Sequence, residues 1–124
     1  MRSLRALVVS KGRGTRAHVG SVLPGTGSTV VRESDDAFDA LRECFEGGTD
    51  VAVVEDSLPR LNGSAMAGIL EEFRAPVTVV LLHSGEHASV DGRLALDPYR
   101  EGFEVILTNV FTALAESPRG VVPC

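Results

Sequence analysis

Short apolar runs, rich in valine, recur at fairly even intervals along the chain. Each run is nearly unbroken by polar residues, which is typical of a strand buried on both faces of a parallel sheet. We therefore predict five strands, at Leu4–Val9, Ser28–Val31, Val51–Val54, Val77–Leu82 and Val105–Leu107.

Segments with helical periodicity fill the intervals between these runs. A serine at the N-cap, two acids in the first turn, apolar residues at i, i+4 and i+8 and a terminal glycine predict one helix from Ser34 to Gly47. The same pattern predicts a helix over Ser64–Phe73, which ends before Pro76. Each of these two helices follows a predicted strand.

Two further intervals give weaker helix signals. Segment 15–23 contains Gly20, and segment 86–101 is broken by Gly92 and Pro98. Both are expected to be helical with uncertain ends.

The regular alternation of strands and helices predicts an α/β fold with right-handed crossovers. At this chain length we expect a flavodoxin-like, doubly wound, five-stranded parallel sheet of order 2-1-3-4-5, with helices on both faces. The last helix, Phe111–Glu116, is expected to be short, because Pro118 and Gly120 follow it. The predicted domain is 1–116, and 117–124 is a tail or the start of a linker.

Composition narrows the class of protein. The 124 residues suffice for one domain, and 44% hydrophobic with 23% charged residues predicts a globular protein without a membrane span. A net charge of −5 argues against direct binding to nucleic acid or to an anionic membrane. No secretory signal is recognised at the N-terminus, so we expect a cytoplasmic protein. Two cysteines, Cys44 and Cys124, predict neither a disulfide framework nor a zinc site.

Candidate chemistry lies just after each strand, because ligands of open parallel sheets bind beyond the carboxyl ends of the strands. The candidates are Ser10 and Lys11 after the first strand, Glu55 and Asp56 after the third, His83 and Ser84 after the fourth, and Thr108 and Asn109 after the fifth. No nucleophile or cluster of metal ligands accompanies the two acids, so we expect no enzymatic activity.

The segment from Asp50 to Gly63, with Glu55-Asp56 ending a strand and a Pro-x-x-Asn-Gly turn after it, resembles the receiver domain of two-component response regulators. In that family the third strand ends in the phosphoacceptor aspartate, and a Pro-x-x-Asp-Gly turn follows. The resemblance extends over nearly the whole chain, since Ala6–Val9, Pro76–Val80 and Gly102–Asn109 match the first, fourth and fifth strand regions. It implies a signalling role.

The residues that carry phosphorylation in receivers are all altered. Ser10 and Lys11 replace the acid pair that holds Mg²⁺, so no Mg²⁺ and no other cofactor is expected. The acceptor position falls on Glu55, with Asp56 next to it. The switch Ser/Thr position aligns with Leu81 or Leu82, or with Ser84 if the loop is shifted. The lysine after the fifth strand aligns with Asn109. Aspartyl phosphorylation is therefore not expected.

Lys11, the only lysine in the sequence, is placed where it could reach Glu55 or Asp56. We hypothesise an internal ion pair that fills the former phosphorylation pocket and fixes one conformation.

Three functions from different classes follow. The first is an atypical receiver-like module that acts by protein–protein contact without phosphorylation, and one form of it is the regulatory domain of a transcription regulator. By the resemblance, it would bind a partner or a second copy through the fourth helix, fifth strand and fifth helix, from Arg93 to Leu114. The second is a sensor of a small anion, bound by Lys11, Arg13 and Asn109 in the vacated pocket. The third is a cryptic phosphoacceptor at Asp56 or Glu55, which would need metal or phosphoryl chemistry despite Lys11.

Overall fold

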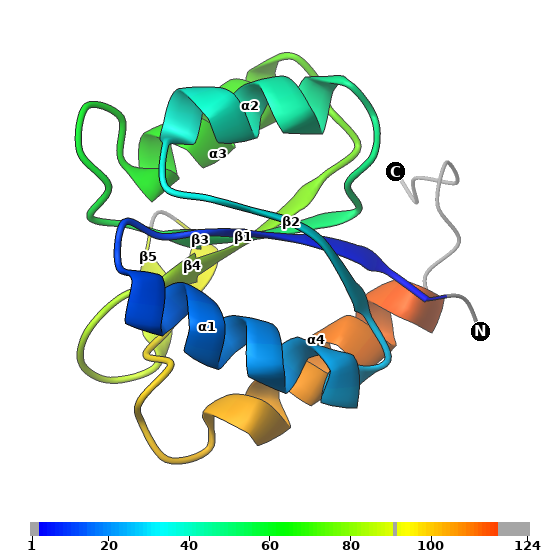
Figure 1. Ribbon diagram of the computed structural model, residues 1–124, viewed down its shortest axis with the longest axis vertical. Coiled ribbons are helices and arrows are strands. Elements are labelled where there is room, and N and C mark those ends of the chain that lie inside the picture. The colour runs from blue at the N-terminus through cyan, green and yellow to red at the C-terminus, as the bar shows by residue number, and fades with distance from the viewer. Residues whose placement is uncertain (1–2, 91, 117–124) are drawn as a thin grey trace.

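A single mixed sheet with helices on both faces makes up the computed structural model, which describes residues 3–90 and 92–116. Helices α1 (Arg13–Val22) and α4 (Phe103–Glu116) cover one face, and α2 (Ala37–Phe45) and α3 (Gly63–Glu72) cover the other (Figure 1). This is the predicted α/β architecture, with two helices on each side of the sheet.

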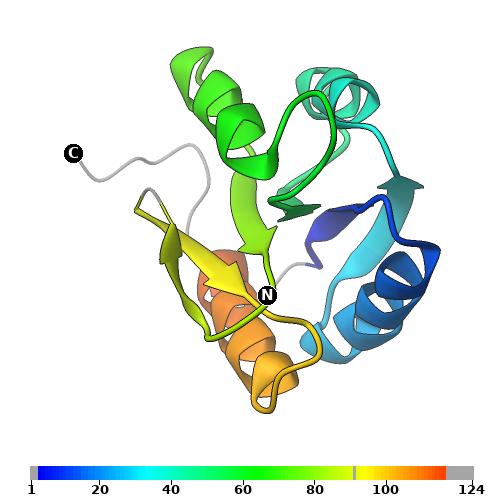
Figure 2. The same cartoon turned by 90° about the vertical axis from the view of Figure 1, so that its left-hand side faces the viewer.

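The sheet has six strands in the order β2-β1-β3-β4-β6-β5, and all neighbours are parallel except β5 and β6. Figure 2 shows the antiparallel hairpin of β5 and β6, in yellow, at one edge of the sheet. A short 3-10 helix connects α1 to the second strand. The remaining bounds are η1 Leu23–Thr26, β1 Arg5–Val9, β2 Thr29–Ser34, β3 Val51–Glu55, β4 Thr78–Leu82, β5 Ala88–Val90 and β6 Arg93–Leu96.

The first four predicted strands are confirmed, but the predicted fifth strand is wrong. Val105–Leu107 lies inside α4, where Phe103, Leu107 and Phe111 recur at helical spacing and are buried against the sheet. The expectation of a short last helix is also wrong, because α4 spans 14 residues.

The fifth parallel strand is β6, which lies in the segment 86–101 that was expected to be helical. Gly92, with φ of 77°, allows the tight turn between β5 and β6. Leu94, Ala95 and Leu96 of β6 then lie partly or fully buried. The sheet therefore keeps the expected parallel order but gains an antiparallel edge strand.

Two apolar clusters, one on each face, hold the sheet to its helices. Successive residues of β1 alternate between them: Ala6 and Val8 face α1 and α4, whereas Leu7 and Val9 face α2 and α3. Burial of both faces explains why the strand is continuously apolar.

Side-chain caps begin the two helices on the second face. Asp36, rather than the predicted Ser34, caps α2, and its carboxylate accepts from the backbone N–H of Phe38. Asn62 caps α3 in the same way by accepting from Ala65. These caps fix where each helix starts relative to the strand before it.

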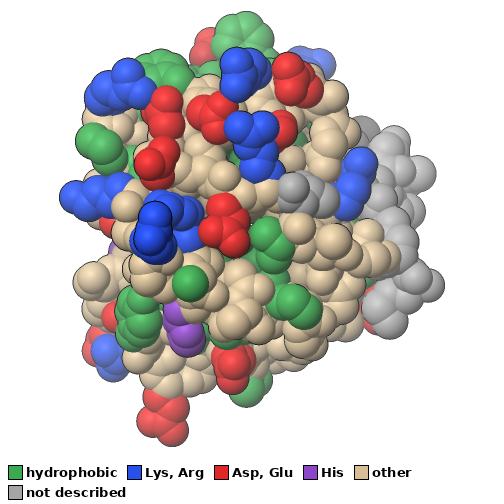
Figure 3. Space-filling model, in the orientation of Figure 1, with side chains coloured by type: hydrophobic (Ala, Val, Ile, Leu, Met, Phe, Trp, Pro, Cys, Tyr) green, Lys and Arg blue, Asp and Glu red, His purple; other side chains and the backbone are tan. Residues whose placement is uncertain are grey.

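The surface carries charges of both signs. On the face drawn in Figure 3, Lys and Arg side chains are interspersed with Asp and Glu side chains over the upper half of the molecule. None of the helices described here is both long and apolar enough to cross a membrane. The predicted tail, 117–124, lies outside the described residues.

Candidate functional site

The carboxyl ends of β1, β3, β4 and β6 meet at one edge of the sheet, as the parallel order requires. This edge brings together Ser10, Glu55, His83 and Asp97, each directly after or at the end of a strand. The candidate site is built around Glu55.

Internal donors surround the Glu55 carboxylate. Its Oε1 accepts from the Ser10 hydroxyl at 2.7 Å and from the Lys11 backbone N–H at 3.1 Å, and its Oε2 accepts from the Ser57 hydroxyl at 2.9 Å. Ser10 is only 1% exposed, and its own Oγ accepts from the Gly12 N–H. Glu55 therefore closes the turn that follows β1.

These contacts keep Glu55 ionised. Burial by itself raises the pKa of the Glu55 carboxyl, but the hydrogen bonds from Ser10, Ser57 and the Lys11 N–H, with a smaller contribution from the Lys11 charge, outweigh it. The net pKa lies below its ordinary value.

The Asp56 side chain contacts α3, whereas the Glu55 side chain contacts the turn after β1. Its Oδ1 accepts from the backbone N–H and the hydroxyl of Ser64, at 2.9 and 2.7 Å, in the first turn of α3. A carboxylate at this position also suits the positive end of the helix. Asp56 thus fixes the start of α3 and does not share a contact with Glu55.

The hypothesised ion pair of Lys11 is wrong. Among the described residues, neither Glu55 nor Asp56 has an ion pair with the Lys11 ammonium, and the Lys11 side chain is exposed. Lys11 contacts Glu55 through its backbone N–H instead. Arg13, in the first turn of α1, is also exposed.

Leu81 and Asn109, the other two predicted pocket residues, do not line the space beside Glu55. Leu81 is fully buried, and its Cδ2 lies close to Gly63 at the start of α3. Asn109 lies exposed in the second turn of α4, far along the chain from any strand end. It was misplaced because the predicted fifth strand is part of a helix.

The residue that follows the true fifth parallel strand is Asp97, with Pro98 after it. Asp97 accepts from the Gly85 N–H at 3.0 Å through Oδ2 and from the Tyr99 N–H at 2.9 Å through Oδ1. These two bonds, more than the nearby charges of His83 and Arg100, hold the pKa of Asp97 below its ordinary value. Sequence reasoning missed it, although an apolar run followed by Asp-Pro was a usable signal.

A small cavity of about 80 Å³ lies between these strand ends. Two carboxylates and several hydroxyls line it, and the contact between the Thr15 and Tyr99 hydroxyls, at 3.2 Å, closes one side. The lining residues are Thr15, Glu55, Ser57, Leu82, His83, Ser84, Asp97, Pro98 and Tyr99. A cavity lined by two carboxylates does not favour binding of an anion. The predicted anion ligands, Lys11, Arg13 and Asn109, do not line this cavity.

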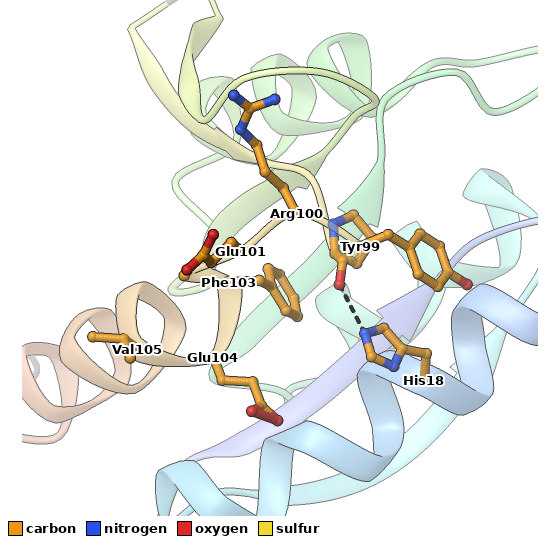
Figure 4. A pocket seen from close by; sticks show the side chains of 9 residues that line it. His18, Tyr99, Arg100, Glu101, Phe103, Glu104 and Val105 are labelled. Carbon is orange, nitrogen blue, oxygen red and sulfur yellow. Dashed lines mark hydrogen bonds between the residues drawn. The ribbon is translucent and has the colours of Figure 1, made fainter.

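A wider surface hollow of about 420 Å³ adjoins the cavity, and Pro98 and Tyr99 line both. Figure 4 shows the His18 ring of α1 bonded to the Pro98 carbonyl, at 2.7 Å, while the Arg100 side chain points away toward the β5–β6 hairpin. The His18 and Tyr99 rings stack with centroids 4.9 Å apart. These contacts attach the loop after β6 to α1.

Comparison with solved structures shows which fold this is. The chain is similar to a signal receiver domain from Mycobacterium tuberculosis, with 21% identity and a TM-score of 0.77 over 94% of this chain and 100% of that one. The response regulator domain of CheB from Thermotoga maritima gives 21% identity and a TM-score of 0.74 over the same shares. A LuxR-family response regulator from Aurantimonas has 18% sequence identity to this chain and a TM-score of 0.73, over 92% of this chain and 86% of that one. At these identities the likeness shows a shared receiver fold.

Comparison by sequence gives no relative. The sequence matches no protein-family model and no curated protein.

Proposed function

We propose that this chain is an atypical receiver-like signalling module that acts by protein–protein contact and not by aspartyl phosphorylation. The observation that carries the proposal is the Glu55 carboxylate, which accepts from Ser10, Lys11 and Ser57 at the strand end where receivers are phosphorylated. A carboxylate held by three donors of its own chain is a poor nucleophile, because each bond stabilises its charge.

The residues around Glu55 do not fit Mg²⁺. A hard cation of this size requires oxygen ligands, mostly carboxylates and water. Here a hydroxyl that already donates to Glu55 and an exposed lysine occupy the two positions after β1. Within residues 3–90 and 92–116, no three His, Cys, Asp or Glu side chains are grouped as metal ligands.

The charge after the fifth parallel strand is also reversed relative to the receivers that the sequence resembles. Asp97 stands where their lysine neutralises the phosphoryl group, and it lines the same cavity as Glu55. Two carboxylates at one cavity would repel a phosphoryl group or its mimic. This feature supports the interaction module over the anion sensor.

The proposed binding surface combines β6 with the loop after it and α4, over Arg93 to Leu114. It replaces the expected face of the fourth helix, fifth strand and fifth helix. One of the similar structures is a complex of CheX with CheY, BeF₃ and Mg²⁺ from Borrelia burgdorferi, so one protein of this fold binds another protein. For this chain we propose a protein partner or a second copy, with no enzymatic activity and no direct contact with nucleic acid.

The test exposes the full chain to acetyl phosphate with Mg²⁺, followed by intact-mass spectrometry, and to beryllofluoride with Mg²⁺, followed by amide correlation spectra. We expect no added phosphoryl group and unchanged amide shifts at Lys11, Glu55, Asp56 and Asp97. A receiver domain with its acids intact, treated in the same buffer, is the positive control. A phosphoryl adduct on Glu55 or Asp56, or shifts confined to this edge, would overturn the proposal.

A further inference from the structure

An apolar groove of about 390 Å³ lies at the open side of β4. Two charged residues, Glu71 and Arg93, are among the described residues that line it, and they pair with each other at 2.5 Å. The other described lining residues are apolar apart from Thr78 and Gly92. They come from α3, β4 and the residue before it, β6 and α4: Ala67, Val77, Val79, Val80, Leu94, Val110 and Leu114.

The groove exists because β6 covers only part of β4. Strand β3 pairs with all five residues of β4, whereas β6 pairs only with Leu81 and Leu82. In the described part of the chain, Thr78–Val80 thus has a ladder partner on one side only. Val77 and Val79, beside this open stretch, are only partly buried.

The end of α4 lies beside this groove. Leu114 is one of its walls, and α4 ends two residues later, at Glu116. The sequence continues with Ser-Pro-Arg-Gly and then Val121 and Val122. Five extended residues span about 17 Å, so the two valines are within reach of the groove. Pro and Gly favour a turn before them, and adjacent β-branched residues favour an extended backbone.

The topology also allows this placement. Helix α4 covers the same face of the sheet as α1 (Figure 1). A connection from β6 through α4 to a segment beside β4 moves across the sheet in the same direction as β1–α1–β2. It therefore has the same right-handed sense, which parallel crossovers adopt almost without exception.

We propose that Gly120–Val122 of the same chain binds in this groove and covers the open side of β4 with the Val121 and Val122 side chains. Binding of this segment does not depend on whether the chain is phosphorylated. It adds a regulatory element to the proposed function, because the groove belongs to the proposed binding surface and the segment would compete with a partner for it.

The test places a nitroxide label on Cys124 of the full chain. Cys44 stays unlabelled, because it is 1% exposed and burial, with the nearby charge of Glu43, raises the pKa of its thiol to about 11. We expect the methyl resonances of Val79, Leu94 and Leu114, which line the groove, to lose intensity, and those of Leu41 in α2, which does not line it, to keep it.

Two variants and a dilution series complete the experiment. Val121→Asp combined with Val122→Asp should abolish the intensity loss, and Arg119→Gln, in the same segment, should retain it. Hydrogen exchange at Thr78–Val80 should be faster in a chain that ends at Glu116 than in the full chain. No intensity loss, a loss that the Asp variants retain, or a loss that grows with protein concentration would overturn the proposal, the last because it indicates exchange between copies. None of these outcomes depends on the phosphodonor experiment, so the two proposals fail separately.

Discussion

The Ser10 hydroxyl donates to Glu55 Oε1 over 2.7 Å and thereby joins the end of β1 to the end of β3. The Ser10 side chain is buried, so the bond is shielded from water. A hydrogen bond to a charged group in such a place contributes about 1.5–3 kcal/mol.

Ser10→Ala is therefore expected to lower the free energy of unfolding by about 1–3 kcal/mol, because Glu55 loses its shortest donor and the Gly12 N–H loses an acceptor. Ser57→Ala is the matched control, since Ser57 also donates to Glu55 but is exposed, so that water can replace it. Urea unfolding of both variants checks this. Equal losses would show that burial at Ser10 is immaterial.

The stability conferred by Glu55 should depend on pH. Its pKa is lowered in the folded state, so its contribution is complete above the unfolded value of about 4.3 and is lost as the pH falls through the folded pKa. The stability difference between the wild type and Glu55→Gln should be constant from neutral pH down to about pH 5 and shrink below it. Urea midpoints measured across this range test the sign. A difference that grows on acidification would contradict the lowered pKa.

At Gly63, the first residue of α3, there is no room for a larger side chain. A Cβ there would lie 3.0 Å from the Glu55 carbonyl oxygen and 3.0 Å from Leu81 Cδ2. Gly63→Ala should therefore destabilise the fold by about 1–3 kcal/mol. Gly68→Ala, in the same helix but with nothing within 4 Å, should stabilise it by about 0.5–1 kcal/mol. Thermal melts of the two variants should show a lower melting temperature for Gly63→Ala and a higher one for Gly68→Ala. An unchanged melting temperature for Gly63→Ala would mean that α3 can shift away from β3.

Asp97 and Asn109 should respond differently to truncation. Asp97→Ala leaves the Gly85 and Tyr99 N–H groups without their acceptor and should cost about 1–2 kcal/mol. Asn109→Ala, on the exposed side of α4, should change stability by less than about 0.5 kcal/mol. Amide spectra should show shifts around the Glu55 cavity only for Asp97→Ala. A larger loss of stability for Asn109→Ala than for Asp97→Ala would contradict the placement of Asp97, and not Asn109, at the cavity.

The first four strands could be predicted because each is an apolar run of strand length, bounded by polar or turn residues and too short for a buried helix. Val51–Val54, for example, is apolar at every position and buried throughout, as a strand covered on both faces must be. The approach of Glu55 to Ser10 then followed from the parallel order of the strands.

The end of the sheet could not be predicted from the same signal. Val105-Ile106-Leu107 and Leu94-Ala95-Leu96 are both apolar triplets, and a run this short fits a strand and a helix equally well. What separates them is tertiary: Phe103, Leu107 and Phe111 pack together on one side of a helix. Because the fifth strand was assigned to Val105–Leu107, the residue expected after it was Asn109, whereas the residue that follows the true strand is Asp97.

The predicted ion pair of Lys11 is wrong for a different reason. Spacing along the chain placed Lys11 beside Glu55, but it could not show that the backbone N–H, and not the ammonium, faces the carboxylate. Side-chain direction at a turn depends on the local dihedral angles, which the pattern of residue types does not fix.

The two-residue pairing between β4 and β6 makes one part of the molecule separable from the rest. Segments held by few ladder bonds open locally without global unfolding. The hairpin and the loop after it carry Asp97, Pro98 and Tyr99, so one such opening would remove a whole wall of the Glu55 cavity, together with Leu96 of one apolar cluster, while β1, β3 and the cluster under α2 and α3 stay intact. The cavity would then belong to two independently unfolding units, a rigid one that holds Glu55 and a labile one that closes over it.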